Sequence, residues 1–130
     1  MDLLLDTHAF LWWIAGEAAL SVPARIAIDD AGNTVFVSAA SAWEIATKFR
    51  IGRLPGAATI VTDLASVLAT QGFVSLPISF RHGQAAGALP GPHKDPFDRM
   101  LIAQAQVEKL VLLTADEALT AYGAAVHLAR

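Results

Sequence analysis

The chain has 130 residues, of which 55% are hydrophobic and 16% charged, and its formal net charge is −3. This length and apolar content exclude a disordered chain and predict one domain over residues 1–130 with a sizeable core. The absence of cysteine excludes disulfides and thiolate metal sites. No basic segment precedes the first apolar stretch and no membrane span is recognisable, so we expect a cytoplasmic protein.

Short apolar runs alternate with helical segments along the chain. The runs predict strands over residues 3–5, 34–37, 73–76 and 111–113, with a weaker fifth over 125–127. The segments between them predict helices over residues 7–16, 21–31, 39–51, 57–70, 79–89, 97–108 and 116–121. Nearly continuous apolar strands are typical of a parallel sheet that is covered on both faces. The pattern therefore predicts an α/β fold.

Four acidic residues stand where apolar runs end or helices begin: Asp6, Glu44, Asp98 and Asp116. The carboxyl ends of parallel strands share one edge of the sheet, and ligand sites lie at that edge. Carboxylates that are close together raise one another's pKa, and a divalent cation removes this cost. Oxygen ligands without cysteine favour Mg²⁺, or alternatively Mn²⁺. The acids therefore predict a metal site and a metal-dependent hydrolase.

Each acid also has a structural explanation, because acidic residues stabilise helix N-termini. Asp6 fits the N-cap of the first helix. The other three acids have a spare capping residue nearby: Ser38 or Ser41 for Glu44, Asp95 for Asp98, and Thr114 for Asp116. Capping alone therefore leaves three of the four acids unexplained.

Two adjacent tryptophans, Trp12 and Trp13, lie in the apolar segment 10–15. Burial in the core is the simpler explanation for this segment. Neighbours on a helix point about 100° apart, so the two rings do not readily face one core. We therefore expect one of them to meet a second copy of the chain or a partner peptide.

The histidines lack zinc spacing, and His8 is interpreted as packing on its helix or as a neighbour of the metal site.

Four sequence blocks occur in order: residues 3–12 (LLLDTHAFLW), 37–46 (VSAASAWEIA), 93–105 (HKDPFDRMLIAQA) and 113–116 (LTAD). Together they resemble the PIN-domain ribonucleases of the VapC toxin type. The resemblance implies a three-layer α/β/α sandwich with a central, mainly parallel sheet. It also implies a Mg²⁺-dependent endoribonuclease that is the toxin of a toxin–antitoxin pair, with an RNA substrate, a small antitoxin partner and a homodimer.

The resemblance also assigns roles to individual residues. The predicted catalytic set is Asp6, Glu44, Asp98 and Asp116, and the predicted metal ligands are Asp6, Asp98 and Asp116. Thr7, Ser38 and Thr114 are expected to contact the metal ligands or a metal-bound water rather than the metal itself. Lys48, Lys94 and Arg99 are candidates for contacts with RNA phosphates. Asp95 is assigned to the helix cap, with its place at the metal left open.

One alternative function belongs to a different class. It is a catalytically silent protein that keeps the PIN fold and binds a partner through the Trp12–Trp13 helix. The presence of all four acids argues against this alternative, and a Mg²⁺ titration discriminates between the two.

Overall fold

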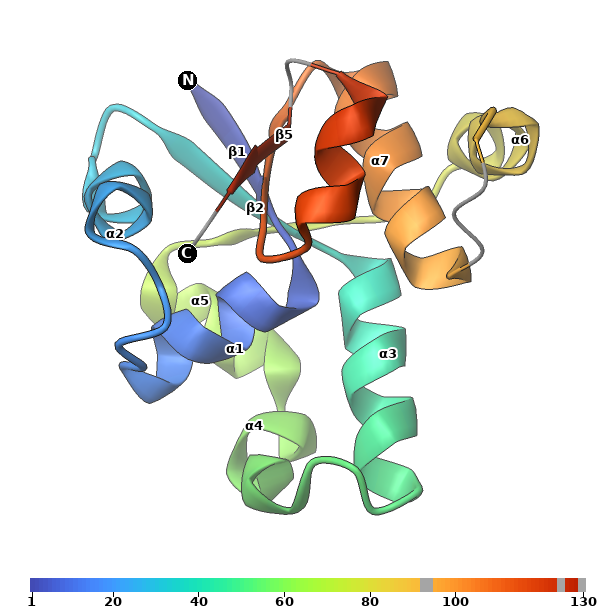
Figure 1. Ribbon diagram of the computed structural model, residues 1–130. Helices are drawn as coiled ribbons and strands as arrows, with labels where there is room; N and C mark the ends of the chain where they lie inside the picture. The colour runs from blue at the N-terminus through green and yellow to red at the C-terminus, as the bar shows by residue number, and fades with distance from the viewer. Residues whose placement is uncertain (92–94, 124–125, 129–130) are drawn as a thin grey trace.

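The computed structural model describes residues 1–91, 95–123 and 126–128, and within these ranges the strands form one parallel sheet (Figure 1). The strands are β1 (Asp2–Leu5), β2 (Thr34–Ser38), β3 (Val74–Leu76), β4 (Val111–Thr114) and β5 (Val126–Leu128). Their order is β3-β2-β1-β4-β5, which places β1 at the centre. Leu4 of β1 aligns with Phe36 on one side and with Leu112 on the other. The five predicted strands are thereby confirmed.

The central strand explains why the sheet needs a layer on each face. Leu3, Leu4 and Leu5 have no exposed surface. Successive side chains of a strand point to opposite faces, so these leucines enter two separate clusters. Leu3 and Leu5 pack with Phe10 in one cluster, and Leu4 packs with Leu101 in the other. The predicted three-layer α/β/α sandwich is confirmed.

Helices supply both outer layers (Figure 1). They are α1 (Thr7–Ala15), α2 (Val22–Asp29), α3 (Ala39–Arg50), α4 (Ala58–Thr62), α5 (Leu64–Gln71), α6 (Phe80–Ala88) and α7 (Pro96–Glu108), with the 3₁₀ segments η1 (Pro55–Ala57) and η2 (Glu117–Tyr122). Residues of α1, α2 and α5 pack on the first cluster, and residues of α7 and η2 pack on the second. No helix within the described ranges is both long and apolar enough to cross a membrane.

The single helix predicted over residues 57–70 is wrong. The chain instead forms η1, α4 and α5, with a break at Asp63, whose φ and ψ are −151° and 78°. The Asp63 carboxylate accepts hydrogen bonds from the backbone N–H and the hydroxyl of Ser66, at 3.1 and 2.6 Å. These bonds lower the pKa of Asp63. The helix therefore breaks at the N-cap Asp63, although the apolar spacing of the sequence continues past it.

Candidate functional site

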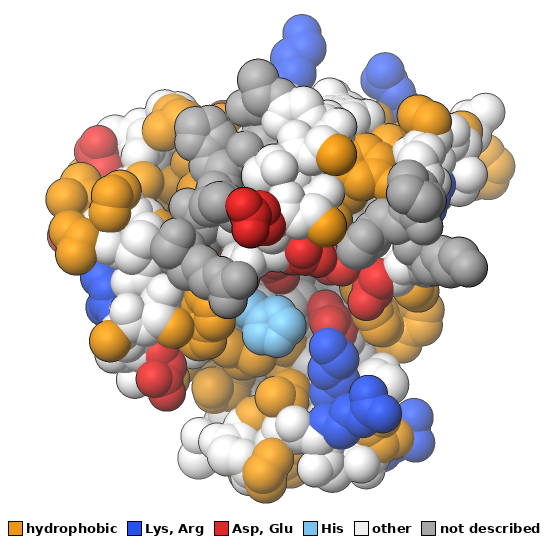
Figure 2. All heavy atoms as spheres, in the orientation of Figure 1, with side chains coloured by type: hydrophobic (Ala, Val, Ile, Leu, Met, Phe, Trp, Pro, Cys, Tyr) orange, Lys and Arg blue, Asp and Glu red, His pale blue; other side chains and the backbone are white. Residues whose placement is uncertain are grey.

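A cavity of about 330 Å³ opens at the carboxyl edge of the sheet. Its lining residues are Asp6, His8, Trp12, Glu44, Lys48, Asp95, Asp98, Ala115 and Asp116. All four predicted catalytic acids are among them. They come from the β1–α1 junction, from α3, from the first turn of α7 and from the segment after β4. Figure 2 shows acidic side chains gathered in this hollow, with Lys and Arg side chains along one rim.

Asp6 is held at the junction of β1 and α1. Its carboxylate caps α1 by accepting the His8 backbone N–H at 3.3 Å, and it also accepts the hydroxyl of Thr114. Asp6 is 4% exposed. Burial raises the pKa of its carboxyl group, and the hydrogen bond from Thr114 opposes this rise only in part. Asp6 therefore presents a poorly solvated carboxylate to the cavity.

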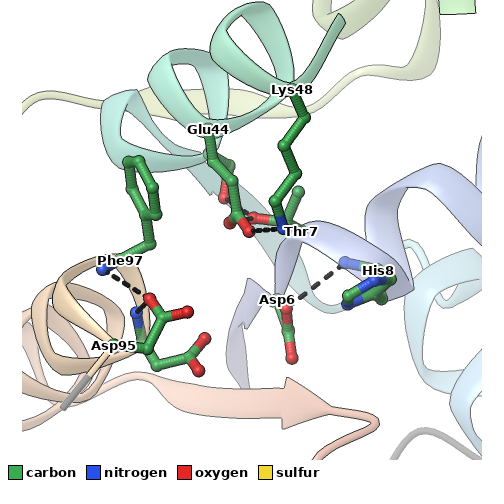
Figure 3. A network of polar contacts seen from close by, with 9 residues as sticks. Asp6, Thr7, His8, Glu44, Lys48, Asp95 and Phe97 are labelled. Atoms are coloured by element: carbon green, nitrogen blue, oxygen red, sulfur yellow. Dashed lines mark hydrogen bonds and ion pairs between the residues drawn. The ribbon is translucent and has the colours of Figure 1, made fainter. Parts of the chain in front are cut away.

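Glu44 is held in the wall of the cavity by two side chains, those of Thr7 and Lys48 (Figure 3). The Thr7 hydroxyl lies 2.7 Å from Glu44 Oε1 and 2.9 Å from the hydroxyl oxygen of Ser41. Lys48, one turn further along α3, forms an ion pair with Glu44 Oε2. Thr7, Ser41 and Glu44 are all buried. This network joins the start of α1 to α3 and leaves both oxygens of Glu44 with a partner.

Asp95 and Asp98 both lie at the start of α7, but they have different roles there. Asp95 Oδ1 accepts the backbone N–H groups of Phe97 and Asp98, at 2.9 and 3.2 Å, so Asp95 is the N-cap (Figure 3). This confirms the capping assignment. Asp98 lies in the first turn of α7 and is half-buried. Both residues line the cavity, so capping does not remove Asp95 from it.

Thr114 and Asp116 connect the end of β4 to the cavity. The buried Thr114 hydroxyl donates to Asp6 and accepts the backbone N–H of Asp116 at 3.0 Å. Asp116 Oδ1 accepts the backbone N–H of Ala118 at 3.0 Å, which makes Asp116 the N-cap of η2. The expectation that Thr114 caps this segment is therefore wrong. The Thr114 hydroxyl turns toward Asp6 instead, and Asp116 is needed as the cap.

Among the described residues, four predicted site residues do not line the cavity: Thr7, Ser38, Arg99 and Thr114. Thr7 and Thr114 nevertheless donate hydrogen bonds to the lining acids Glu44 and Asp6. Ser38 caps α3 through the backbone N–H of Ala40 at 2.9 Å, and its hydroxyl donates to Gln104. Arg99 donates from its guanidinium to the carbonyl oxygens of Ala86 and Leu89, and so ties α6 to α7. Lys94 lies outside the described residues. Of the two predicted phosphate contacts within the described ranges, Lys48 lines the cavity and Arg99 does not.

Sequence reasoning missed the position of Trp12. Trp12 lines the cavity beside His8, with ring centroids 6.2 Å apart, and Trp13 instead packs on Phe73 and donates Nε1–H to Gln71. Both tryptophans are half-buried, whereas Trp43 on α3 is 63% exposed. The spacing of His8 and Trp12 was the available signal, because residues four apart share one face of a helix.

The donor atoms at the cavity suit a hard divalent cation in chemical type. Carboxylate oxygens are the ligands that Mg²⁺ and Mn²⁺ prefer, and the buried carboxylate of Asp6 forms no ion pair with a Lys or Arg of the described chain. Within the same ranges, however, no three Asp, Glu or His side chains are grouped tightly enough to hold one ion. Metal binding here therefore requires the carboxylates to turn toward one another or to bind through water.

Comparison with known proteins identifies the family. The PIN-domain model matches residues 3–125. A search of curated proteins gives no significant match. A chain of VapBC2 from Rickettsia felis, bound to a DNA fragment from their promoter, has a TM-score of 0.72 at 16% identity and covers 98% of this chain and 97% of that chain. A chain of a toxin–antitoxin complex from Klebsiella pneumoniae has a TM-score of 0.69 at 19% identity and covers 98% of each chain. The structural likeness shows the fold, and the family model spans all four acids, so the chain belongs to the PIN-domain family.

Proposed function

We propose that this chain is a metal-dependent endoribonuclease that hydrolyses RNA phosphodiester bonds and acts as the toxin of a toxin–antitoxin pair. The observation that carries the proposal is the convergence of four carboxylates, from four separate segments, on one cavity of a PIN domain. The likeness to toxin–antitoxin structures supports the pairing with an antitoxin. Both the RNA substrate and the antitoxin imply a cytoplasmic protein.

Asp6, Asp98 and Asp116 would hold Mg²⁺, or Mn²⁺ in its place. The bound ion would neutralise charge on the scissile phosphate and lower the pKa of a water molecule. Asp6 is fixed for this task by the hydroxyl of Thr114 and the backbone N–H of His8. In the reaction, a water oxygen bonds to phosphorus while the bond from phosphorus to the leaving nucleotide oxygen breaks. The leaving oxygen takes up a proton, so one product ends in a phosphate and the other in a hydroxyl group.

Glu44 is assigned a different role from the aspartates. Its two oxygens already engage Thr7 and Lys48, so it acts as a positioning residue. Thr7 lies next to Asp6 in the chain and links Glu44 to the start of α1. Through these contacts Glu44 fixes Lys48 and the α3 wall of the cavity relative to Asp6.

The proposed partners follow from the charge and the exposed surface of the chain. An acidic cavity complements a basic segment of a small antitoxin, whose tail would compete with RNA for the site. A homodimer needs an exposed apolar surface. Trp43 and Phe80 are 63% and 94% exposed, and Ile78 is 39% exposed. These residues offer a better contact surface than the half-buried Trp12 and Trp13.

The proposal is tested by cleavage of single-stranded RNA with the purified chain in the presence of Mg²⁺. Asp6→Asn and Asp98→Asn should abolish cleavage while circular dichroism shows an unchanged fold, and EDTA should abolish cleavage by the wild type. Asp63→Asn is a matched control because Asp63 is an N-cap away from the cavity, and asparagine is an equally good cap. Cleavage that persists in EDTA and in both site variants would remove the proposal.

One observation favours the silent alternative. The acidic side chains of the described ranges are not grouped as a ready metal site. A protein that keeps the fold and binds only a partner requires no such grouping. Calorimetric titration with Mg²⁺ separates the two functions, because a silent protein would release no heat of binding that depends on Asp6.

A further inference from the structure

Lys48 and Glu44 form an ion pair within the acidic cavity. Lys48 Nζ contacts Glu44 Oε2, and both side chains line the cavity (Figure 3). The Glu44 side chain is 6% exposed, whereas that of Lys48 is 31% exposed. The carboxylate is therefore the buried member of the pair, and the ammonium group is the member that a substrate can reach.

Charge compensation differs between the two sides of the cavity. Glu44 Oε1 accepts the Thr7 hydroxyl at 2.7 Å and Oε2 accepts from Lys48, so a divalent ion at Glu44 would have to displace a cation. Within the described ranges, the hydrogen bonds that Asp6 accepts come from neutral groups, which are the Thr114 hydroxyl and the His8 backbone N–H. Glu44 therefore has a lysine as its ion-pair partner, whereas Asp6 has no Lys or Arg partner in the described part of the chain.

We propose that Lys48 supplies the second positive charge of the catalytic site, so that each chain binds a single divalent ion on the aspartate side of the cavity. This inference rests on the proposed function. In a two-metal site, two cations about 3.5–4 Å apart stabilise the attacking and the leaving oxygens. Here an ammonium group takes the place of one cation. An ammonium group has three N–H donors. One is used on Glu44, which leaves two for oxygens of the scissile phosphate.

A simpler reading of the same contact is a stabilising pair on α3. Glu44 and Lys48 are four residues apart on α3, a spacing at which oppositely charged side chains stabilise a helix. If Lys48 only offsets the burial of Glu44, its removal should weaken the fold without changing how many metal ions bind. The two readings therefore differ in metal stoichiometry.

The experiment is a titration of the full chain with Mn²⁺, followed by electron paramagnetic resonance. The wild type should bind about one Mn²⁺ per chain. Lys48→Met removes the ammonium group but keeps the length of the side chain. Glu44 then becomes a free ligand, and the count should rise to about two, with a spin-coupled signal. The double variant Lys48→Met with Glu44→Gln should return to about one.

Two further variants complete the design. Lys48→Arg keeps the positive charge and should leave the count unchanged. Arg50→Met is the matched control, because Arg50 is an exposed cation on the same helix that does not line the cavity. Circular dichroism shows whether each variant is folded, and the wild-type count tests the inference even where Lys48→Met fails to fold.

The possible failures are distinguishable. A wild-type chain that binds two Mn²⁺ overturns the inference and leaves the proposed nuclease standing. A folded Lys48→Met variant that still binds a single ion shows that the pair is only structural, which also overturns it. A wild-type chain that binds no Mn²⁺ overturns the proposed function together with the inference.

Discussion

Asp6 is the residue at which the stability of the fold and the proposed metal binding oppose each other. Burial raises the pKa of its carboxyl group above the ordinary value of 3.8. A raised pKa in the folded state means that the protonated form favours folding. Protonated Asp6 stabilises the folded state fully at a pH below the pKa that Asp6 has in the unfolded chain. This stabilisation is lost as the pH rises through the higher pKa of Asp6 in the folded state. As the pH rises toward neutrality, ionisation of this carboxyl group therefore destabilises the metal-free fold.

The first prediction follows from the destabilising effect of the Asp6 charge on the metal-free fold. Asp6→Asn should raise the melting temperature of the metal-free protein at neutral pH, and the gain should vanish below pH 3.8, where the wild-type carboxyl is protonated in both states. Mg²⁺ should raise the melting temperature of the wild type but not that of the variant. Calorimetry at several pH values measures both effects. A variant that is less stable than the wild type at neutral pH would contradict the argument.

The second prediction concerns Thr114, whose hydroxyl joins Asp6 to the backbone N–H of Asp116. Thr114→Val leaves two polar groups without their partner at a fully buried position, and such a loss costs about 1–3 kcal/mol. Thr114→Ser keeps the hydroxyl and should lose much less stability. Urea unfolding of the three proteins measures the difference. Equal stability of the Val and Ser variants would show that the hydroxyl contributes nothing.

At the scale of residues, sequence reasoning succeeded where a contact is local. Asp95 followed by Pro96 predicts an N-cap because both preferences act within one turn. It failed for Thr114 and Asp116, because the direction of the Thr114 hydroxyl is set by Asp6, which is distant in sequence. The hydrogen bond between Ser38 and Gln104 also joins residues that are distant in sequence, and no pattern near Ser38 predicts it.

At the scale of elements, α7 tests whether capping and metal binding are separate tasks. Asp95 caps the helix and Asp98 lies in its first turn, yet both face one cavity. Helix caps are interchangeable among Ser, Thr, Asp and Asn, whereas a carboxylate ligand is not replaced by a hydroxyl. The same substitution at the two positions therefore gives opposite expectations.

The third prediction uses this contrast. Asp95→Ser should keep both the stability, within about 1 kcal/mol, and the cleavage of RNA, since serine is a good N-cap. Asp98→Ser should leave the fold intact but reduce cleavage at least about 100-fold, by analogy with the loss of one electrostatic contact to a transition state. Thermal unfolding and initial cleavage rates measure the two effects. Loss of cleavage in Asp95→Ser alone would reassign the ligand to Asp95.

The strands and the broken helix show what periodicity can and cannot predict. β1 is apolar after Asp2 because both faces of the sheet are covered, so this strand was recognisable from its own residues. The break at Asp63 was not, because the apolar residues continue on both sides of it. A capping residue within a continuous apolar pattern can be recognised only when the ends of the helices are known.

At the scale of the whole molecule, parallel topology is what assembles the site. Asp6 and Asp116 follow neighbouring strands, β1 and β4, and Glu44 lies on the helix after β2, so the shared edge brings them together. This convergence was predictable from the sequence once the strands were taken as parallel. The exposed surface was not predictable, because the sequence pattern does not show that Trp43 is 63% exposed while Trp12 and Trp13 are half-buried.

The final prediction places the proposed homodimer on the exposed apolar residues Trp43, Ile78 and Phe80. Phe80 is 94% exposed, so Phe80→Glu removes no packing from the monomer, but it would place a charge inside the contact between two chains. The variant should sediment as a monomer at concentrations where the wild type is a dimer. Ile26→Glu is the matched control, because Ile26 on α2 is also exposed, at 65%, outside this surface. A dimer that survives Phe80→Glu but dissociates in Ile26→Glu would move the contact to α2.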